Sequence, residues 1–193
     1  MPKTRRPNQK QRIRRKAAEL FAKQGYEATG IQELCDAVGL GRGALYHHIG
    51  TKEQLLYDIV NAGAVRAVEH AEALLSTQLT AEQKVRELSR VVMEAIVDDL
   101  PTWTVFYRES HMLSGELRRE AMAWRHRFED VWRAVIREGV EAGEFREIDP
   151  LAIKGILGMH NYAPMWISPQ GPRSADEISE VFCDLFLAGL RVS

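Results

Sequence analysis

Several features are scarce in this chain of 193 residues. It has two cysteines, seven prolines and only 8% aromatic residues, and no stretch of about 18 apolar residues occurs in it. Cys35 and Cys183 lie far apart without metal-ligand spacing, so we expect no disulfide, bound metal or cofactor. The missing apolar run argues against a membrane span, and the first ten residues lack the apolar core of a secretory signal. We therefore expect a cytoplasmic protein.

Patterns typical of enzymes and of β-sheets are also missing. The chain has no glycine-rich phosphate loop, no zinc pattern and no paired Glu-x-x-His motif of a di-iron bundle. We therefore expect a protein that is not an enzyme. No segment shows sustained strand-type alternation, whereas apolar residues recur at helical spacing throughout. The fold class predicted is all-α.

The charges are unevenly distributed. The net charge is −1, but residues 1–50 hold ten lysines and arginines against four acids. Residues 51–193 hold 16 basic and 23 acidic residues. A basic module on an acidic body is typical of a DNA-binding protein. We expect residues 1–8 to be a disordered basic arm that adds phosphate contacts.

Capping residues, glycines and prolines divide the chain into nine expected helices. Serine or threonine followed three residues later by Glu or Gln marks a helix start at Thr29, Thr51, Thr80 and Ser174. Pro101 is expected to end a helix. The expected helices cover about 9–24, 29–38, 42–49, 51–76, 80–100, 103–111, 114–143, 150–164 and 174–191. We expect the fourth helix to bend at Ala62-Gly63-Ala64, where the side chains are small.

The segment 29–52 has the punctuation of two short helices joined by a tight turn. Gly39 suits the left-handed position that follows a helix. The apolar positions of both helices repeat at helical spacing: Ile31, Leu34, Val38, Leu45 and Ile49. Such a unit is a helix-turn-helix, which places its second helix in the major groove of DNA.

This segment resembles the DNA-binding domain of the TetR family of transcriptional regulators. The matching residues are Gly39-Leu40, Gly43, Leu45-Tyr46, His48, Ile49 and Lys52. Three positions depart from the family pattern: Ile49 replaces the usual Phe, Gly41 a common Ser or Thr, and Cys35 a common Ala. The change at Gly41 removes a hydroxyl that in the family often caps the recognition helix or contacts a phosphate.

The resemblance implies which residues contact DNA. They are Thr29, Gly41, Arg42, Ala44, Tyr46, His47 and Lys52. Arg42 and Ala44 would face base edges, Gly41 would allow a close approach of the backbone, and the others would contact phosphates. A bidentate bond from arginine to guanine contributes about 1–3 kcal/mol of discrimination. Two alternatives stay open: Arg42 contacts only phosphate, or Tyr46 packs against the first helix.

The last two expected helices are apolar on more than one face. A surface helix needs one apolar stripe for its own core, so the surplus suggests a second subunit. In the TetR family these helices form a four-helix dimer interface. The residues assigned to it are Ile153, Leu157, Phe182, Phe186 and Leu190. The alternative is that both helices are simply central in the monomer.

Aromatic residues cluster in the second half of the chain and suggest a pocket for an apolar ligand. The chosen pocket residues are Trp103, Tyr107, Trp124, Phe128, Asn161, Tyr162 and Trp166; for any one of them, ordinary core packing is the alternative. The pattern of residues 138–150, with the later Trp-Ile-Ser-Pro-Gln-Gly-Pro, is similar to TetR-type regulators of lipid and steroid catabolism. Several of those sense acyl-CoA thioesters.

The predicted organisation is therefore a three-helix helix-turn-helix head over 9–50 and a ligand-binding and dimerisation bundle of about six helices over 51–193. The predicted function is a homodimeric transcriptional regulator. It would be a repressor released from a palindromic, double-stranded operator by an apolar small molecule, with an acyl-CoA thioester as one candidate. The alternative is a DNA-binding adaptor whose helical body binds another protein.

Overall fold

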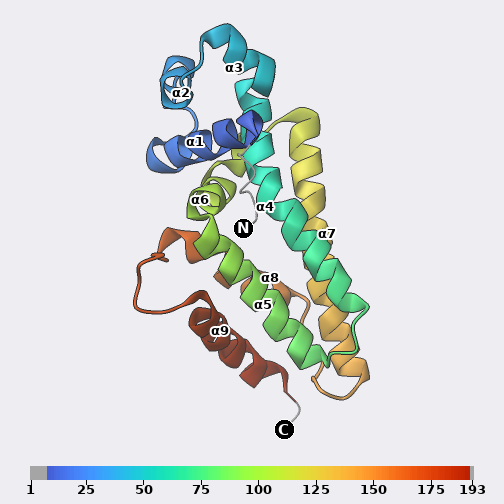
Figure 1. The fold of residues 1–193 in the computed structure, drawn as a ribbon. Coiled ribbons are helices and arrows are strands. Elements are labelled where there is room, and N and C mark those ends of the chain that lie inside the picture. The colour runs from blue at the N-terminus through green and yellow to red at the C-terminus, as the bar shows by residue number, and fades with distance from the viewer. Residues whose placement is uncertain (1–7, 192–193) are drawn as a thin grey trace, which may run out of the picture. The chain divides into compact units, whose positions relative to one another are not determined.

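The computed structural model describes residues 8–191, which form nine α-helices and no β-strand (Figure 1). The helices are α1 Gln9–Gln24, α2 Ile31–Val38, α3 Arg42–Ile49, α4 Lys52–Leu75, α5 Ala81–Asp98, α6 Leu100–Glu109, α7 Gly115–Glu141, α8 Leu151–Tyr162 and α9 Ala175–Leu190. The all-α prediction is confirmed, with the helix-turn-helix at the N-terminal end. Within this part of the chain, no helix has both the length and the apolar character needed to cross a bilayer. The expected basic arm lies outside the described residues, except Asn8.

Most helix starts follow from local capping. Thr80 and Ser174 form two of the capping boxes that the sequence predicts, with Gln83 and Glu177, and Asn8 forms a further one with Gln11. In each box a side-chain oxygen accepts a backbone N–H that the first turn would leave unpaired. These boxes explain why the predicted starts of α1, α5 and α9 agree with the observed ones to within one residue.

Two local predictions were wrong. Gly30, not Thr29, is the N-cap of α2, and the Thr29 hydroxyl instead donates to the Gly25 carbonyl at 2.8 Å. Pro101 does not end α5, which stops at Asp98; it lies in the first turn of α6. Proline is tolerated there because first-turn amides have no partner within the helix.

The contacts divide the chain into two compact units. The first comprises Met1–Ala62 and Pro101–Ala121, and the second comprises Gly63–Leu100 and Met122–Ser193. The boundary within α4 therefore falls in the Ala62-Gly63-Ala64 stretch. Among the described residues, the first unit holds α6 and the start of α7 as well as the three head helices. The assignment of functions to 9–50 and 51–193 stays a prediction.

In the first unit, α1, α2 and α3 pack around a small apolar core (Figure 1). Its fully buried side chains include Ile13, Phe21, Leu34 and Leu45. Polar contacts reinforce it: Arg12 donates to the Val38 carbonyl at 2.6 Å, and Lys10 pairs with Asp58 at 2.7 Å. These contacts join α1 to the end of α2 and to α4, so the turn before α3 is supported on a rigid base.

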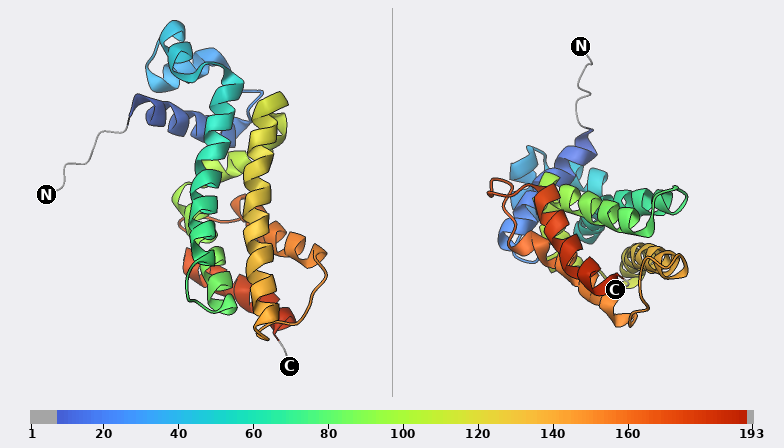
Figure 2. Two further views of the ribbon diagram at one scale, coloured as in Figure 1. Left: turned by 90° about the vertical axis from the view of Figure 1, so that its right-hand side faces the viewer. Right: turned by 90° about the horizontal axis from the view of Figure 1, so that it is seen from below.

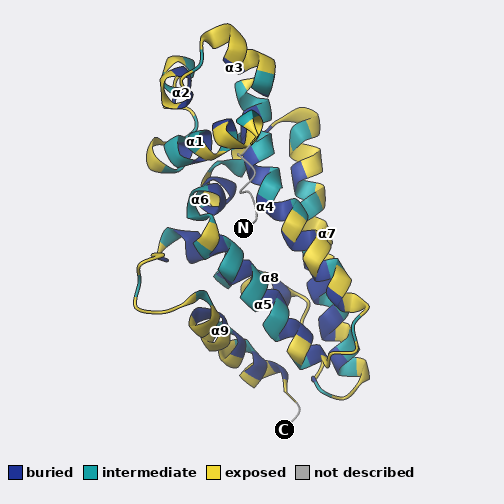
Figure 3. Cartoon of the chain, in the orientation of Figure 1, coloured by how far each residue is buried: buried dark blue, intermediate teal, exposed yellow. Residues whose placement is uncertain are grey.

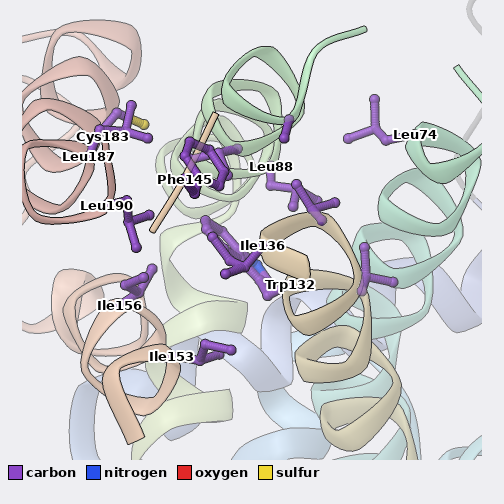
Figure 4. Close-up of a cluster of buried hydrophobic side chains, with 14 of the residues drawn as sticks. Leu74, Leu88, Trp132, Ile136, Phe145, Ile153, Ile156, Cys183, Leu187 and Leu190 are labelled. Carbon is purple, nitrogen blue, oxygen red and sulfur yellow. The ribbon is translucent and has the colours of Figure 1, made fainter. Parts of the chain in front are cut away.

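The second unit has a larger core that the end of α4 builds together with α5, α7, α8 and α9 (Figure 4). Trp132 and Ile136 of α7 pack there with Ile153 and Ile156 of α8. The C-terminal parts of α4 and α7 run side by side (Figure 2), joined by the bidentate pair of Arg127 with Glu72 at 2.7 and 2.9 Å. Because each helix buries a stripe in this cluster, the orientation of α8 and α9 about their own axes is determined within the single chain.

Polar contacts also fasten α9 to α5. The Arg86 guanidinium of α5 hydrogen-bonds to Glu82, Glu180 and Asp184, with a distance of 3.0 Å to Asp184. Arg191, which follows α9, donates to Glu82 at 2.6 and 3.1 Å. The side of α9 that carries these groups is therefore engaged with its own chain.

Candidate nucleic-acid interface

The turn between α2 and α3 has the geometry that a helix-turn-helix requires. Gly39 has a φ of 64°, in the left-handed region that favours glycine. The Leu40 amide donates to the Cys35 carbonyl at 3.0 Å, which satisfies an end carbonyl of α2. The chain can therefore turn sharply and begin α3 at Arg42.

One face of α3 is buried and the other is exposed (Figure 3). Leu45 and Ile49 are buried against the head, as predicted. The exposed residues of the helix and its N-cap are Gly41, Arg42, Gly43, Ala44, Tyr46 and His47. A short helix with a guanidinium, a phenol and an imidazole on its free face can present hydrogen-bond donors to a DNA groove and its phosphates.

Two of the predicted DNA-contacting residues, Thr29 and Lys52, do not lie on the exposed face of α3 and make contacts within the head. Thr29 is fully buried, and its hydroxyl is used by the Gly25 carbonyl. The Lys52 ammonium donates to the Tyr26 carbonyl at 2.6 Å and lies 4.4 Å from the centre of the Tyr26 ring. Burial lowers the pKa of Lys52 from its ordinary value, opposed by the nearby Glu27 carboxylate. In the free protein, both residues hold the α1–α2 loop.

The predicted pocket residues belong to different units. Trp103 and Tyr107 are in the first unit, where Trp103 is buried edge-to-face against Phe106 and Tyr107 is exposed. The other five are in the second unit. There the Arg127 guanidinium lies 4.3 Å from the centre of the Trp124 ring and covers it. The remaining four are Phe128, which is packed against the core, half-buried Asn161, and exposed Tyr162 and Trp166.

A cavity of about 300 Å³ in the second unit is lined by different residues. They are Arg133, Ile136, Arg137 and Val140 of α7, Glu147, Ile148 and Pro150 of the following loop, and Ile153 of α8. None of the seven predicted pocket residues contributes to it. Sequence reasoning missed this cavity because its residues are ordinary helix-face aliphatics and arginines, without an aromatic signal.

The residues predicted for the dimer interface have two orientations. Ile153 and Leu190 are buried in the core of the single chain, whereas Leu157, Phe182 and Phe186 are half-buried. Five large apolar side chains stay exposed in this part of the chain. They are Leu151 and Tyr162 on α8, Trp166 directly after η2 (the 3-10 turn Ala163–Met165), and Val181 and Leu185 on α9. Helical spacing finds both stripes, but it does not say which one faces the chain's own core.

A buried polar cluster lies between α5, α8 and α9. His160 is almost fully buried; its Nδ1 lies 2.8 Å from the Ile156 carbonyl, and its Nε2 lies 2.8 Å from the Ser89 hydroxyl. Since a carbonyl only accepts, Nδ1 carries the proton and Nε2 accepts from Ser89. Ser89 in turn accepts from Ser179 at 3.0 Å. Burial lowers the pKa of His160 from 6.5 to about 4, and the Ile156 bond opposes this only in part.

This cluster predicts a pH dependence of stability. Above pH 6.5 His160 is neutral in the folded and unfolded chain alike, so it adds no slope. Between pH 6.5 and about 4 the unfolded chain binds a proton that the folded chain excludes. The free energy of unfolding should therefore decrease as the pH is lowered from 6.5 to about 4. Urea unfolding of the protein and of His160→Gln across this window measures the effect. Equal pH slopes for both proteins would contradict it.

An exposed recognition-type helix on a helix-turn-helix, joined to a helical body, defines a DNA-binding regulator. The chain belongs to the TetR family: residues 13–59 match the family model described as bacterial regulatory proteins, tetR family. Residues 78–190 match the model described as tetracyclin repressor-like, C-terminal domain. The family is one of DNA-binding regulators.

Relatives match along nearly the whole chain. It is 27% identical over 177 residues to the HTH-type transcriptional repressor KstR2 of Rhodococcus jostii, covering 90% of this chain and 87% of that one. The structure of the regulator PfmR from Thermus thermophilus is 37% identical, with a TM-score of 0.87 over 94% of this chain and 100% of PfmR. AibR, solved with isovaleryl coenzyme A and operator DNA, is 25% identical, with a TM-score of 0.82 over 92% of this chain and 97% of AibR.

Proposed function

We propose that this protein is a homodimeric, cytoplasmic transcriptional repressor that leaves an inverted-repeat operator when a small molecule binds its helical body. The exposed face of α3 is the main support for DNA recognition. Arg42 and Ala44 would face base edges, Tyr46 and His47 would contact phosphates, and Gly41 would allow close approach. Thr29 and Lys52 would support DNA binding indirectly, because they hold the α1–α2 loop that supports the turn before α3.

The dimer part of the proposal rests on one stripe of α8 and one of α9. Along α8, Leu151, Gly155, Gly158 and Tyr162 are all exposed. A glycine inside a helix costs about 1 kcal/mol relative to alanine. A methyl group added at Gly155 or Gly158 would meet nothing within 4 Å in the single chain, so the chain's own packing does not require either glycine. Close approach of a second copy, which would also cover the exposed Val181 and Leu185 of α9, explains why α8 has glycine at these positions.

The effector part rests on relatives. AibR is named with bound isovaleryl coenzyme A, and KstR2 of Mycobacterium tuberculosis is titled a ketosteroid transcriptional regulator. An acyl-CoA thioester is therefore the first effector to test. Its binding site would involve the predicted residues of the second unit, which are Trp124, Phe128, Asn161, Tyr162 and Trp166. By linkage, an effector that loosens DNA must itself be loosened by DNA to the same extent.

Selection of bound duplexes from random DNA tests the DNA-binding part. We expect an inverted repeat, and we expect Arg42→Ala to weaken binding by about tenfold or more and to relax preference at one base pair of each half-site. Arg173→Ala, which removes the same charge from an exposed site between α8 and α9, is the matched control and should bind normally.

The effector is tested next on the selected operator. Fluorescence anisotropy with acyl-CoA thioesters of increasing chain length should show release by one class of chain. A thioester that binds the protein but leaves its operator affinity unchanged would defeat ligand control by that compound. Binding of the selected DNA without any inverted-repeat preference would defeat the dimeric reader.

A further inference from the structure

The cavity between the end of α7 and the start of α8 combines an aliphatic floor with charged side chains. Ile136 and Ile153 of the floor belong to the rigid core of the second unit, and both are almost fully buried. Val140 and Ile148 are packed against that core. The floor is therefore formed before any ligand arrives, which lowers the cost of binding.

Two arginines one helical turn apart line this cavity. Residues at i and i+4 share a helix face, so Arg133 and Arg137 stand close together, an arrangement that disfavours folding unless an anion is nearby. Arg133 hydrogen-bonds to Glu129, but Glu129 also pairs with Lys154. Arg137 is exposed, and across residues 8–191 its guanidinium has no ion pair or hydrogen bond. Within the described part of the chain, this face of α7 therefore carries one guanidinium, that of Arg137, without an acidic partner.

One acid lies on the opposite side. Glu147 of the loop also lines the cavity. Counting Arg133, Arg137 and Lys154 against Glu129 and Glu147, the cavity and its immediate ion pairs carry one net positive charge. A single anionic group would neutralise it, and the planar fork of a guanidinium suits the two oxygens of a carboxylate.

We infer that this cavity binds a small amphipathic monoanion, a carboxylate with a short aliphatic chain. The carboxylate would meet Arg137 and Arg133, and the chain would lie on the isoleucine and valine floor. The volume of about 300 Å³ lies at the lower end of the range for ligand sites, so the ligand is small. This site is separate from the predicted aromatic effector site, and its ligand would bridge α7 to α8.

Methyl NMR of the full chain with labelled isoleucine tests the inference without DNA. We expect titration with hexanoate to shift the methyl signals of Ile136, Ile148 and Ile153 saturably. Neutral hexanol and cationic hexylammonium, which have chains of the same length, should bind at least about tenfold more weakly, as the loss of one charged contact implies. Shifts absent at these three residues, or hexylammonium binding as tightly as hexanoate, would overturn it.

Charge variants locate the anion. Arg137→Gln should weaken hexanoate by about tenfold. Arg118→Gln, an exposed arginine earlier on α7 and outside the cavity, should leave it unchanged. Glu147→Gln should leave binding unchanged or tighten it, because a carboxylate opposite the arginines is removed. Equal effects of Arg137→Gln and Arg118→Gln, or weaker binding in Glu147→Gln, would overturn the site. Operator binding is a separate measurement, so failure here leaves the proposed function intact.

Discussion

Replacing Leu185 with glutamate is expected to turn the proposed dimer into monomers and to lower operator affinity by about a hundredfold or more. Leu185 is 67% exposed on α9, and its neighbour one turn earlier, Val181, is 50% exposed. Leu151 and Tyr162 on α8 are likewise exposed, at 72% and 55%. A carboxylate buried there between two copies would have no partner, and an unpaired buried charge is strongly unfavourable.

The loss of DNA affinity follows from geometry. A single two-turn recognition helix has few contacts, and a dimer makes the second half-site contact intramolecular. Because Leu185 is exposed in the single chain, the substitution should leave the fold intact. Phe182 and Phe186 are less suitable positions, since they contact His160 and Trp132 within the monomer.

Sedimentation velocity and operator titration measure both effects together. Leu79→Glu is the matched control, because Leu79 is an exposed leucine in the loop between α4 and α5, outside the exposed stripes of α8 and α9. That control should stay dimeric and bind DNA normally, because Leu79 belongs to neither exposed stripe. A Leu185→Glu protein that remains a dimer would refute this interface.

Gly139→Ala is expected to lower the free energy of unfolding by about 3 kcal/mol, at the upper end of overpacking costs. A methyl group at Gly139 would lie 2.1 Å from Cδ2 and 2.5 Å from Cε2 of Phe145, and 2.9 Å from the Ala81 side chain. These distances are far inside van der Waals contact. The Phe145 ring cannot yield easily, because it is buried in the second unit's core.

The backbone around Phe145 adds to this rigidity. The amides of Glu144 and Phe145 both donate to the Gly139 carbonyl, at 2.8 and 3.0 Å. The next amide, that of Arg146, donates to the Leu190 carbonyl at 2.8 Å. The loop after α7 is thereby held against both α7 and α9, so expelling the ring would break several contacts.

A double-substitution cycle in urea unfolding identifies the clash as the cause. Phe145→Ala alone should cost about 3–5 kcal/mol. Adding Gly139→Ala to it should cost much less than Gly139→Ala costs in the intact protein, since the ring is gone and only the 2.9 Å approach to Ala81 remains. Gly43→Ala, where an added methyl meets nothing within 4 Å, should cause no loss of stability. Additive effects of the two substitutions would contradict the clash.

Local signals in the sequence predicted the helices well. Thr80 and Ser174 cap helices as expected because each box needs only residues three positions apart. Thr29 has the same local pattern but failed, since its hydroxyl found the Gly25 carbonyl at the end of α1 instead. A side chain with two available partners is assigned by packing, which the local pattern does not contain.

The predictability of the functional surfaces differs in the same way between local and long-range features. The exposed face of α3 was predictable, because Leu45 and Ile49 have to be buried and the intervening residues then face outward. The cavity in the second unit was not predictable. Arg127 covers Trp124, and a separate cavity lies over Ile136 and Ile153 that no local pattern indicated, because cavities depend on how several helices meet.

By itself, the sequence determined that this chain is helical, where most of its helices begin, and that its basic first quarter contains a helix-turn-helix. These properties depend on residues within one or two helical turns of each other. Only the tertiary structure decided which stripe of α8 and α9 stays exposed, which groups Lys52 contacts in the free protein, and where a cavity opens. Those properties depend on pairs of residues distant in the chain, whose contacts arise only when the helices pack.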